Sequence, residues 1–291
     1  MTHSISVREL IQRTEKQFNQ ADLYYGHGTD NALDEAFYLV MIAAGLEFDC
    51  NEEALDKPLQ DNVTEHIESL VEKRISQRIP VAYLVNKAWF AGREFYVDER
   101  VLIPRSPFAE LITSQFMPWI SYSQVKTILD IGTGGACIPI ACAYEFSEAV
   151  IDAVDIDDDA IDVANKNVAL HELQERVHVI KSNLFEQLKG KKYDLIISNP
   201  PYVGHDEMQS LPEEYLHEPR HALEANDNGL ELVGKILNMA SEHLNEGGIL
   251  VVEVGNSKEV LIEGYPELPF IWLEFENGGD GVFVLNKADL V

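Results

Sequence analysis

From Val125 onward the sequence alternates between short apolar stretches and longer amphipathic ones, and this alternation restricts the fold more than any other feature. Short apolar runs bounded by turn residues indicate buried strands, and a 3.6-residue period between them indicates helices. We expect strands at 127–131, 150–154, 178–181, 193–198 and 248–254, with helices that include 159–170 and 229–244. This order predicts an α/β fold with a doubly wound parallel sheet.

The C-terminal tail departs from this alternation. Two apolar stretches, 270–275 and 281–285, are joined by the loop sequence Asn277-Gly278-Gly279-Asp280. A connection this short can join antiparallel strands but not parallel ones. We therefore expect an antiparallel C-terminal strand pair.

The N-terminal part of the chain has a helical pattern up to about residue 79, with apolar residues such as Val7, Leu10, Val63 and Ile67 at helical spacing. The stretches 89–91 and 94–97 flank Gly92-Arg93 and predict a hairpin, and a helix is expected at about 108–117. We therefore expect a small helical domain over 1–85, a hairpin linker over 86–107 and the α/β domain over 108–291.

The charge balance limits the classes of partner. The chain has 22 Lys and Arg against 50 Asp and Glu, a net charge of −28. Such a surface repels phosphate backbones and attracts basic proteins, although solubility alone explains it equally well. We expect no direct recognition of nucleic acid.

Cysteine usage and hydropathy exclude further classes. The three cysteines, Cys50, Cys137 and Cys142, form no CxxC pair, so we expect neither a disulfide framework nor a metal site. No apolar run approaches the length of a membrane span, and the first residues lack the apolar segment of a secretion signal. These features predict a cytoplasmic protein without membrane association.

A glycine-rich turn, Asp130-Ile131-Gly132-Thr133-Gly134-Gly135-Ala136, follows the first expected strand of the sheet. Glycines let the backbone approach a ligand, and the next helix presents free N–H groups to it. Cys137 stands where a dinucleotide fingerprint has its last glycine, which argues against that class. An acid two residues before the first glycine instead suits S-adenosyl-L-methionine, a nucleoside with a positively charged methionine. The candidate contacts are Asp130, Gly132, Thr133 and Gly134.

Two more strand ends add polar residues to this candidate site. Asp155 ends the second expected strand, where an acid can accept hydrogen bonds from both ribose hydroxyls. Asn183 follows the third strand, and its side-chain oxygen can accept from the adenine amine. A loop-capping role explains Asn183 almost equally well.

The tetrapeptide Asn199-Pro200-Pro201-Tyr202 follows the fourth strand, at the edge where open sheets bind ligands. Asn199 offers a side-chain carbonyl and Pro200 a main-chain carbonyl, while Pro201 lacks an N–H and holds Pro200 extended. Tyr202 can stack on a planar amide. These groups predict a catalytic site that grips a planar NH₂ and aims its nitrogen at a methyl donor, with Asn199 also bordering the cofactor. The exocyclic amine of adenine fits the same arrangement, so the pattern leaves the acceptor open.

The chain resembles the HemK-like protein-glutamine methyltransferases from about Arg78 to the C-terminus. The similar segments are 80–84, 102–105, the glycine loop, 199–202, 218–219 and 222–223. The branch that methylates large-subunit ribosomal protein L3 is similar over nearly the whole chain, through 26–31, 86–90, 95–100, 104–107 and 277–283. The release-factor branch differs, because Ser106-Pro107-Phe108-Ala109-Glu110 stands where that branch has Pro-Glu-Thr-Glu.

The resemblance implies a class I (Rossmann-like) methyltransferase domain and a helical domain that recognises the substrate. It also implies S-adenosyl-L-methionine as cofactor and N5-methylation of one glutamine in that basic ribosomal protein during ribosome assembly. Two positions depart from the family: Ala136 replaces a glycine, and Asn183 replaces an aspartate. Asn183 keeps an acceptor without the charge, which leaves its adenine role open.

Arg105 and Glu110 are further candidates for orienting the substrate, together with Tyr202; a surface ion pair between linker residues is the plainer interpretation. Two other functions share the motifs. An adenine-N6 methyltransferase would use the same tetrapeptide, but its expected basic face is missing at this net charge. A non-enzymatic assembly factor would not need the glycine loop or Asn199.

Overall fold

The computed structural model describes residues 5–225 and 230–290, and it separates the chain into two compact units. The first comprises Met1–Ala88 together with Pro212–His217, and the second comprises Trp89–Leu211 and Glu218–Val291. This division differs from the expected domains in two respects. The expected linker is not a separate part, because the second unit already begins at Trp89, and a short segment from the C-terminal half belongs to the first unit.

The first unit is helical, as its apolar periodicity indicates. In the first helix, α1 Val7–Gln20, the buried Val7, Leu10, Ile11 and Phe18 lie on one face, and Ser6 and Glu9 form a capping box at its start. The other elements are α2 Ala32–Ala43, α3 Glu52–Leu55, α4 Asp61–Gln77, α5 Val81–Val85 and the 3₁₀ helix η2 Glu213–His217.

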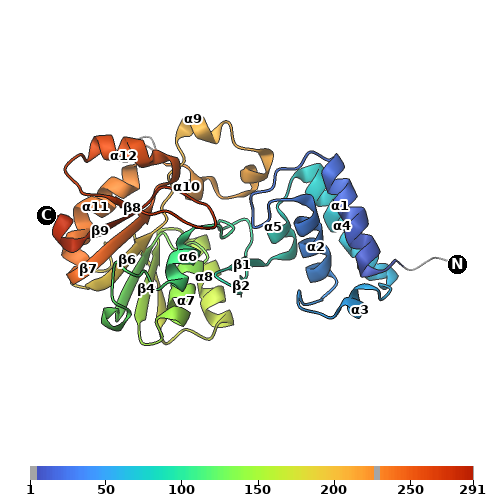
Figure 1. The fold of residues 1–291 in the computed structure, drawn as a ribbon, viewed down its shortest axis with the longest axis horizontal. Helices are drawn as coiled ribbons and strands as arrows, with labels where there is room; N and C mark the ends of the chain where they lie inside the picture. The colour runs from blue at the N-terminus through green and yellow to red at the C-terminus, as the bar shows by residue number, and fades with distance from the viewer. Residues whose placement is uncertain (1–4, 226–229, 291) are drawn as a thin grey trace. The chain divides into compact units, whose positions relative to one another are not determined.

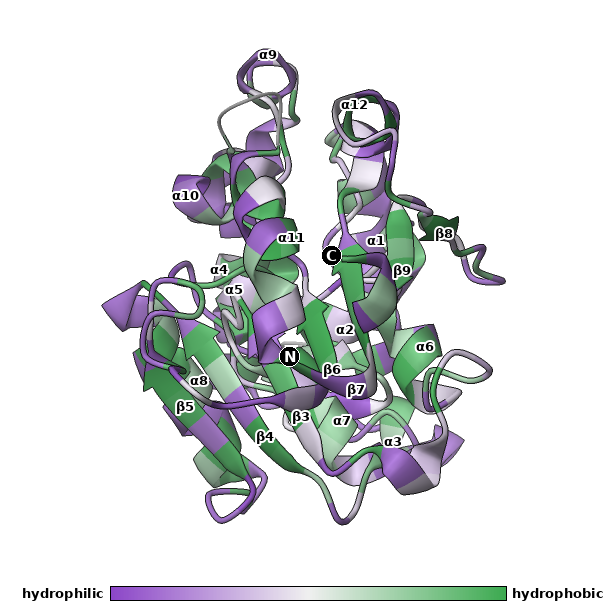
Figure 2. Cartoon of the chain, turned by 90° about the vertical axis from the view of Figure 1, so that its left-hand side faces the viewer, coloured by the Kyte–Doolittle hydropathy of each residue, from purple (hydrophilic) through white to green (hydrophobic). Residues whose placement is uncertain are grey.

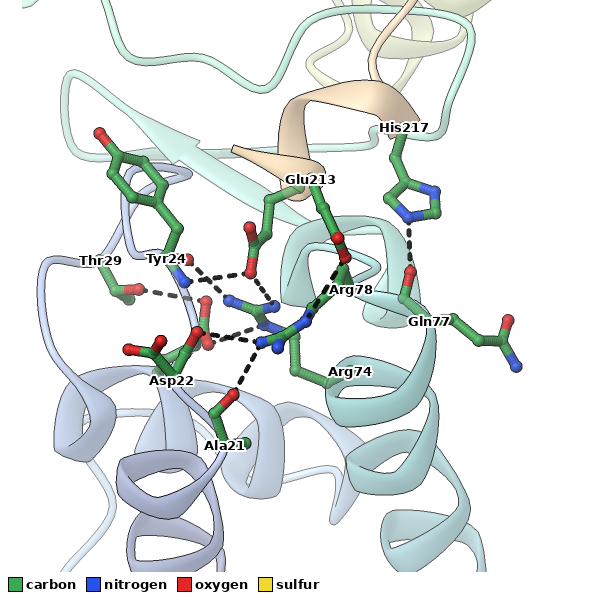
Figure 3. A network of polar contacts seen from close by, with 11 residues as sticks. Ala21, Asp22, Tyr24, Thr29, Arg74, Gln77, Arg78, Glu213 and His217 are labelled. Carbon is green, nitrogen blue, oxygen red and sulfur yellow. Dashed lines mark hydrogen bonds and ion pairs between the residues drawn. The ribbon is translucent and has the colours of Figure 1, made fainter. Parts of the chain in front are cut away.

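The segment Pro212–His217 is anchored in this helical unit by a buried ion-pair cluster around Arg74 (Figure 3). Arg74 is 1% exposed and donates to Glu35 at 2.9 Å, to Glu214 at 3.0 Å and to the carbonyl of Tyr24 at 2.8 Å. Burial raises the pKa of Glu35 despite Arg74. Burial also acts to raise the pKa of Glu214, but the hydrogen bonds from Arg74 and from backbone N–H groups outweigh it and lower the pKa. One cation thus joins three segments that are distant in sequence.

The second unit begins within the expected hairpin, whose strands are β1 Ala88–Phe90 and β2 Arg93–Phe95. The helix that follows, α6 Phe108–Thr113, is shorter than the expected 108–117. Gln115 and Phe116 take left-handed backbone conformations, with φ of 55° and 56°, so the α-helix ends before them.

The main sheet has the strand order β5-β4-β3-β6-β7-β9-β8. The strands β3 to β7 are parallel, and β9 pairs antiparallel with both β7 and β8, as the tail predicted. Their bounds are β3 Thr127–Ile131, β4 Val150–Asp155, β5 Val177–Lys181, β6 Tyr193–Ser198, β7 Leu244–Glu253, β8 Ile271–Trp272 and β9 Val282–Asn286. The strand β7 starts four residues earlier than expected, because Leu244 already pairs with Tyr193 ahead of an irregular stretch.

Alternate residues of the central strands pack into two separate cores, one on each face of the sheet. Ile128 and Ile197 face the core formed with α6 and α7, whereas Leu129 and Ile196 face the core formed with α11 and α12. Figure 1 shows these helices on the two faces, and Figure 2 shows hydrophobic residues along the strands between them. This is the doubly wound arrangement expected from the sequence.

The remaining elements of the second unit connect or cover these strands. They are η1 Tyr122–Gln124, α7 Cys137–Glu145, α8 Asp158–Leu170, α9 His205–Met208, α10 Arg220–Leu223, α11 Glu231–His243, η4 Gly255–Ser257, α12 Lys258–Gly264 and η5 Lys287–Asp289. The helix expected over 229–244 corresponds to α11, and its expected first residue, Gly229, lies outside the described residues. Within 5–225 and 230–290, no helix is both long and apolar enough to cross a membrane.

Candidate cofactor and substrate site

A pocket of the second unit lies where the carboxyl ends of β3, β4, β5 and β6 meet. It brings together four stretches that the sequence singled out separately: the glycine loop, Asp155, Asn183 and the turn after β6. The lining residues are Arg100, Val101, Leu102, Ile131, Gly132, Gly134, Val154, Asp155, Ile156, Ala160, Ser182, Asn183, Leu184, Asn199, Pro200, Pro201, His221, Ala222 and Leu232. Tyr202 does not belong to this lining, although it follows directly in the chain.

The glycine loop needs left-handed backbone conformations at three positions. Gly132, Gly134 and Ala136 have φ of 73°, 52° and 62°. Glycine adopts such angles freely, whereas alanine pays roughly 1–2 kcal/mol for them. Ala136 is fully buried at the start of α7, so the departure from the family costs backbone strain but places no bulky group in the pocket.

Asp155 is held in place by the loop that it faces. Its Oδ2 accepts from the N–H of Gly134 at 2.9 Å, and its Oδ1 accepts from the N–H of Asp157 at 3.1 Å. Burial raises the pKa of Asp155, and these backbone hydrogen bonds oppose the rise. Each carboxylate oxygen keeps a second lone pair, so the aspartate remains able to accept from a ribose.

Asn183 lies at the exposed rim of the pocket. Its side-chain nitrogen donates to Glu186 at 2.8 Å, which leaves the side-chain oxygen as the group available to a ligand. The structure shows the loop-stabilising role of this amide and places Asn183 in the pocket lining; its contact with adenine stays a prediction.

Asp130 is buried and directly precedes Ile131, which lines the pocket. It is 1% exposed, and within the described part of the chain neither of its oxygens makes a well-aligned hydrogen bond. Burial raises the pKa of this carboxyl to about 7; the nearby hydroxyl of Thr133 opposes the rise, and the charge of Asp155 adds to it. A buried carboxylate without a well-aligned partner is costly, so the site gains free energy when a positive group approaches it.

The turn after β6 is fixed to its surroundings on both sides. Ser198, the last residue of β6, donates its hydroxyl to the carbonyl of Ile131 at 2.8 Å, which ties the turn to the glycine loop. After the turn, the N–H of Val203 donates to the carbonyl of Leu223 at 2.9 Å. Asn199, Pro200 and Pro201 are thereby held in the wall of the pocket that contains Asp155.

Arg105 and Glu110 do not pair with each other, so the ion pair considered for them is wrong. Arg105 makes a two-pronged ion pair with Glu218, at 2.5 and 2.6 Å, and Glu218 also accepts from the N–H of Ile103. The carboxylate of Glu110 accepts from the N–H groups of Glu276 and Asn277 at 3.1–3.3 Å. Both residues thus brace loops of the second unit.

Two residues outside the predicted cofactor and substrate contacts brace the site. Asn167 is fully buried in α8 and donates to the carbonyls of Gly135 and Tyr96, so it fixes the glycine loop. Its only sequence signal was a polar residue on the apolar face of an amphipathic helix. Glu253, at the end of β7, accepts from the Tyr202 hydroxyl at 3.0 Å. An acid that ends a buried strand was its signal.

The comparisons with known proteins agree with this geometry. Residues 112–234 match the family model described as the methyltransferase small domain. The solved hMettl16 catalytic domain, in complex with a MAT2A 3′UTR hairpin, is 18% identical with a TM-score of 0.52, covering 86% of this chain and 89% of that one. This likeness concerns the fold alone. The fold and pocket define an S-adenosylmethionine-dependent methyltransferase of class I.

Two curated relatives are similar over almost the whole chain. The ribosomal protein uL3 glutamine methyltransferase of Francisella tularensis is 45% identical over 287 residues, covering 98% of this chain and 91% of the relative. That of Neisseria meningitidis is also 45% identical, covering 98% and 94%. The chain belongs to the family of ribosomal protein uL3 glutamine methyltransferases.

The residues in and directly beside the pocket fit S-adenosyl-L-methionine. The buried carboxylate of Asp130, next to the lining residue Ile131, suits the positively charged methionine, and Asp155 in the lining suits the ribose hydroxyls. Ile156 and Leu184 supply apolar surface for a flat base.

The raised pKa of Asp130 predicts that cofactor binding weakens in acid. Below pH 7 the carboxyl is protonated in the free protein, and a bound cation must displace that proton, so the dissociation constant rises as the pH falls. We expect a rise of up to about tenfold per pH unit below pH 7, measured by calorimetry between pH 6 and pH 8. An Asp130→Asn variant should bind more weakly and lose this pH dependence. Equal affinity of the unaltered protein at pH 6 and pH 8 would contradict the assignment.

Proposed function

We propose that this chain methylates the side-chain amide nitrogen of a glutamine in ribosomal protein uL3, with Asn199, Pro200, Pro201 and Tyr202 as the catalytic turn. The observation that carries the proposal is that Asn199, Pro200 and Pro201 of this turn line one pocket with the cofactor residues Asp155 and Gly134. The shared substrate of two relatives that are 45% identical over nearly the full chain supports the choice of uL3.

The chemistry requires positioning more than a strong base. The nitrogen of a carboxamide is a poor nucleophile because its lone pair is delocalised into the carbonyl. The side-chain oxygen of Asn199 and the main-chain oxygen of Pro200 can accept the two N–H bonds of the amide and thereby orient its nitrogen. The bound cofactor supplies an electrophilic methyl group on sulfur. Once methylated, the amide becomes acidic enough to lose its proton without a dedicated base.

The two prolines give the turn its stiffness. Pro201 presents no N–H that would compete for the carbonyl oxygens, and its ring restricts Pro200 to extended conformations. Pro200 is buried in the wall of the pocket. We propose that Tyr202 supplies the flat surface on which the amide of the substrate lies.

We assign Arg105 and Glu110 an indirect part in substrate binding. Arg105 is tied to the buried Glu218, and Glu110 is occupied by the loop at Glu276 and Asn277. A pocket of the second unit lies between these braced segments and is lined by Gly92, Pro107 and Gly278 as well. We infer that they shape the surface that meets uL3 and that neither carries out a chemical step.

The charge of the chain supports a basic protein as partner. With 50 acidic and 22 basic side chains, the net charge of −28 attracts a basic ribosomal protein and repels RNA and DNA. The proposed encounter takes place in the cytoplasm, during ribosome assembly.

A transfer assay with radiolabelled S-adenosylmethionine tests the proposal. Purified uL3, its variant with every exposed glutamine replaced, ribosomal RNA and DNA serve as parallel acceptors. We expect label on unaltered uL3 only. Label on RNA or DNA would favour an adenine-N6 methyltransferase, and no label on any acceptor, with cofactor binding intact, would favour a binding role in assembly.

A further inference from the structure

The tyrosine of the catalytic turn is held by Glu253 at the end of β7 and by two residues of η4, which follows β7. Its hydroxyl donates to Glu253 Oε1 at 3.0 Å, and its carbonyl accepts from the hydroxyl of Ser257 at 3.2 Å. A Cβ added at Gly255 would lie 2.6 Å from the Tyr202 ring, so the ring packs directly over the backbone there. Little freedom remains for this side chain.

Glu253 is the group on which this arrangement converges. It is 5% exposed, and its second oxygen, Oε2, accepts from the hydroxyl of Ser106 at 2.5 Å. Ser106 Oγ in turn accepts from the N–H of Phe108 at the start of α6. Burial raises the pKa of Glu253, while the hydrogen bonds from Ser106 and Tyr202 oppose the rise. One buried carboxylate therefore joins the catalytic turn to the segment that carries Arg105.

We propose that Glu253 is a positioning residue that fixes, through the hydroxyl of Tyr202, the angle at which the tyrosine ring meets the substrate amide. A tyrosine ring turns about two side-chain bonds, and a hydrogen bond at its far end removes that freedom. Reactions that depend on near-attack geometry lose rate when a positioning group moves by about 1 Å. This inference rests on the proposed function, because it assumes that Tyr202 contacts the glutamine.

The chain contains a matched control for this pair. Tyr193 donates its hydroxyl to the buried carboxylate of Asp152 at 2.6 Å, in the same kind of contact. Tyr193 begins β6, and Asp152 lies in the first half of β4, so this pair is near the amino ends of the strands, away from the pocket. Loss of the Tyr193 hydroxyl therefore disturbs the fold in a comparable way without touching the turn.

The test compares Tyr202→Phe, Glu253→Leu, the double variant and Tyr193→Phe in steady-state methylation of uL3; leucine is used at 253 because a glutamine would keep an oxygen able to accept from Tyr202. We expect the first two to lower kcat about tenfold, with the cofactor dissociation constant and the KM for uL3 changed less than threefold. The double variant should be no slower than the slower single variant, because both changes remove the same interaction. Tyr193→Phe should lower the midpoint of thermal unfolding and leave kcat unchanged.

Several outcomes would overturn the inference: kcat near the parental value for both single variants, effects that multiply in the double variant, or an equal loss of kcat in Tyr193→Phe. Asn199→Ala, assayed in parallel, separates this inference from the function on which it rests. If Asn199→Ala keeps the parental rate, the proposed site is wrong. If Asn199→Ala is slow and Glu253→Leu is not, only the role of Glu253 fails.

Discussion

Replacing Asn199 by alanine is expected to lower kcat for methyl transfer to uL3 by about 10²–10³-fold, because the variant loses one of the two oxygens that orient the substrate amide. This is the size of effect found when one preorganised polar contact to a reacting group is removed. The cofactor dissociation constant should change much less, because the glycine loop and Asp155 remain in the pocket. Single-turnover methylation with saturating cofactor measures the effect directly.

Asn165→Ala is a suitable control for this variant. Asn165 is exposed on α8 and does not belong to the pocket lining. The Asn165→Ala variant should methylate uL3 at the rate of the unaltered protein. A parental rate for Asn199→Ala, under conditions in which Asn165→Ala is also unaffected, would refute the assigned role of the turn.

Replacing Arg74 by methionine is expected to destabilise the helical unit by about 3–5 kcal/mol, the usual consequence of removing one partner from a buried ion pair. Arg74 is 1% exposed, and the variant leaves the carboxylates of Glu35 and Glu214 buried without their cation. The loss should shrink in acid, where the two carboxyls take up protons. Urea unfolding followed by circular dichroism measures this loss of unfolding free energy. Separate transitions of the two units are fitted individually.

Arg13→Met provides the comparison for this prediction. Arg13 pairs with Glu68 on the surface of the same unit, with side-chain exposures of 44% and 50%. Exposed ion pairs contribute little, so this variant should unfold close to the parental urea concentration. Equal stability of Arg74→Met and Arg13→Met would contradict the claim that the ion-pair cluster around Arg74 anchors the segment Pro212–His217.

The sheet was predictable because each strand is a short apolar run between turn residues. Thr127–Ile131 and Tyr193–Ser198 agree with the expected bounds, and β4 and β5 differ by one residue. The short α6 was not predictable, since the left-handed conformations of Gln115 and Phe116 have no signature in residue type. The placement of Pro212–His217 in the helical unit was equally hidden. It depends on Arg74 and Glu214, which are distant in sequence, and no local pattern encodes such a pair.

The pocket was largely predictable for a topological reason. Parallel strands end at one edge of a sheet, so polar residues that follow successive strands, such as Asp155, Asn183 and Asn199, meet there. The partners that brace the site were not predictable. Arg105 could have paired with Glu110, and only the folded chain brings the buried Glu218 to it instead.

The most direct test of the central claim is a crystal structure of this protein with S-adenosylhomocysteine and a uL3 fragment that contains the modified glutamine. We expect the glutamine amide nitrogen within about 2.7–3.2 Å of both the side-chain oxygen of Asn199 and the main-chain oxygen of Pro200. A glutamine bound elsewhere, or one whose amide nitrogen points away from these two oxygens, would contradict it.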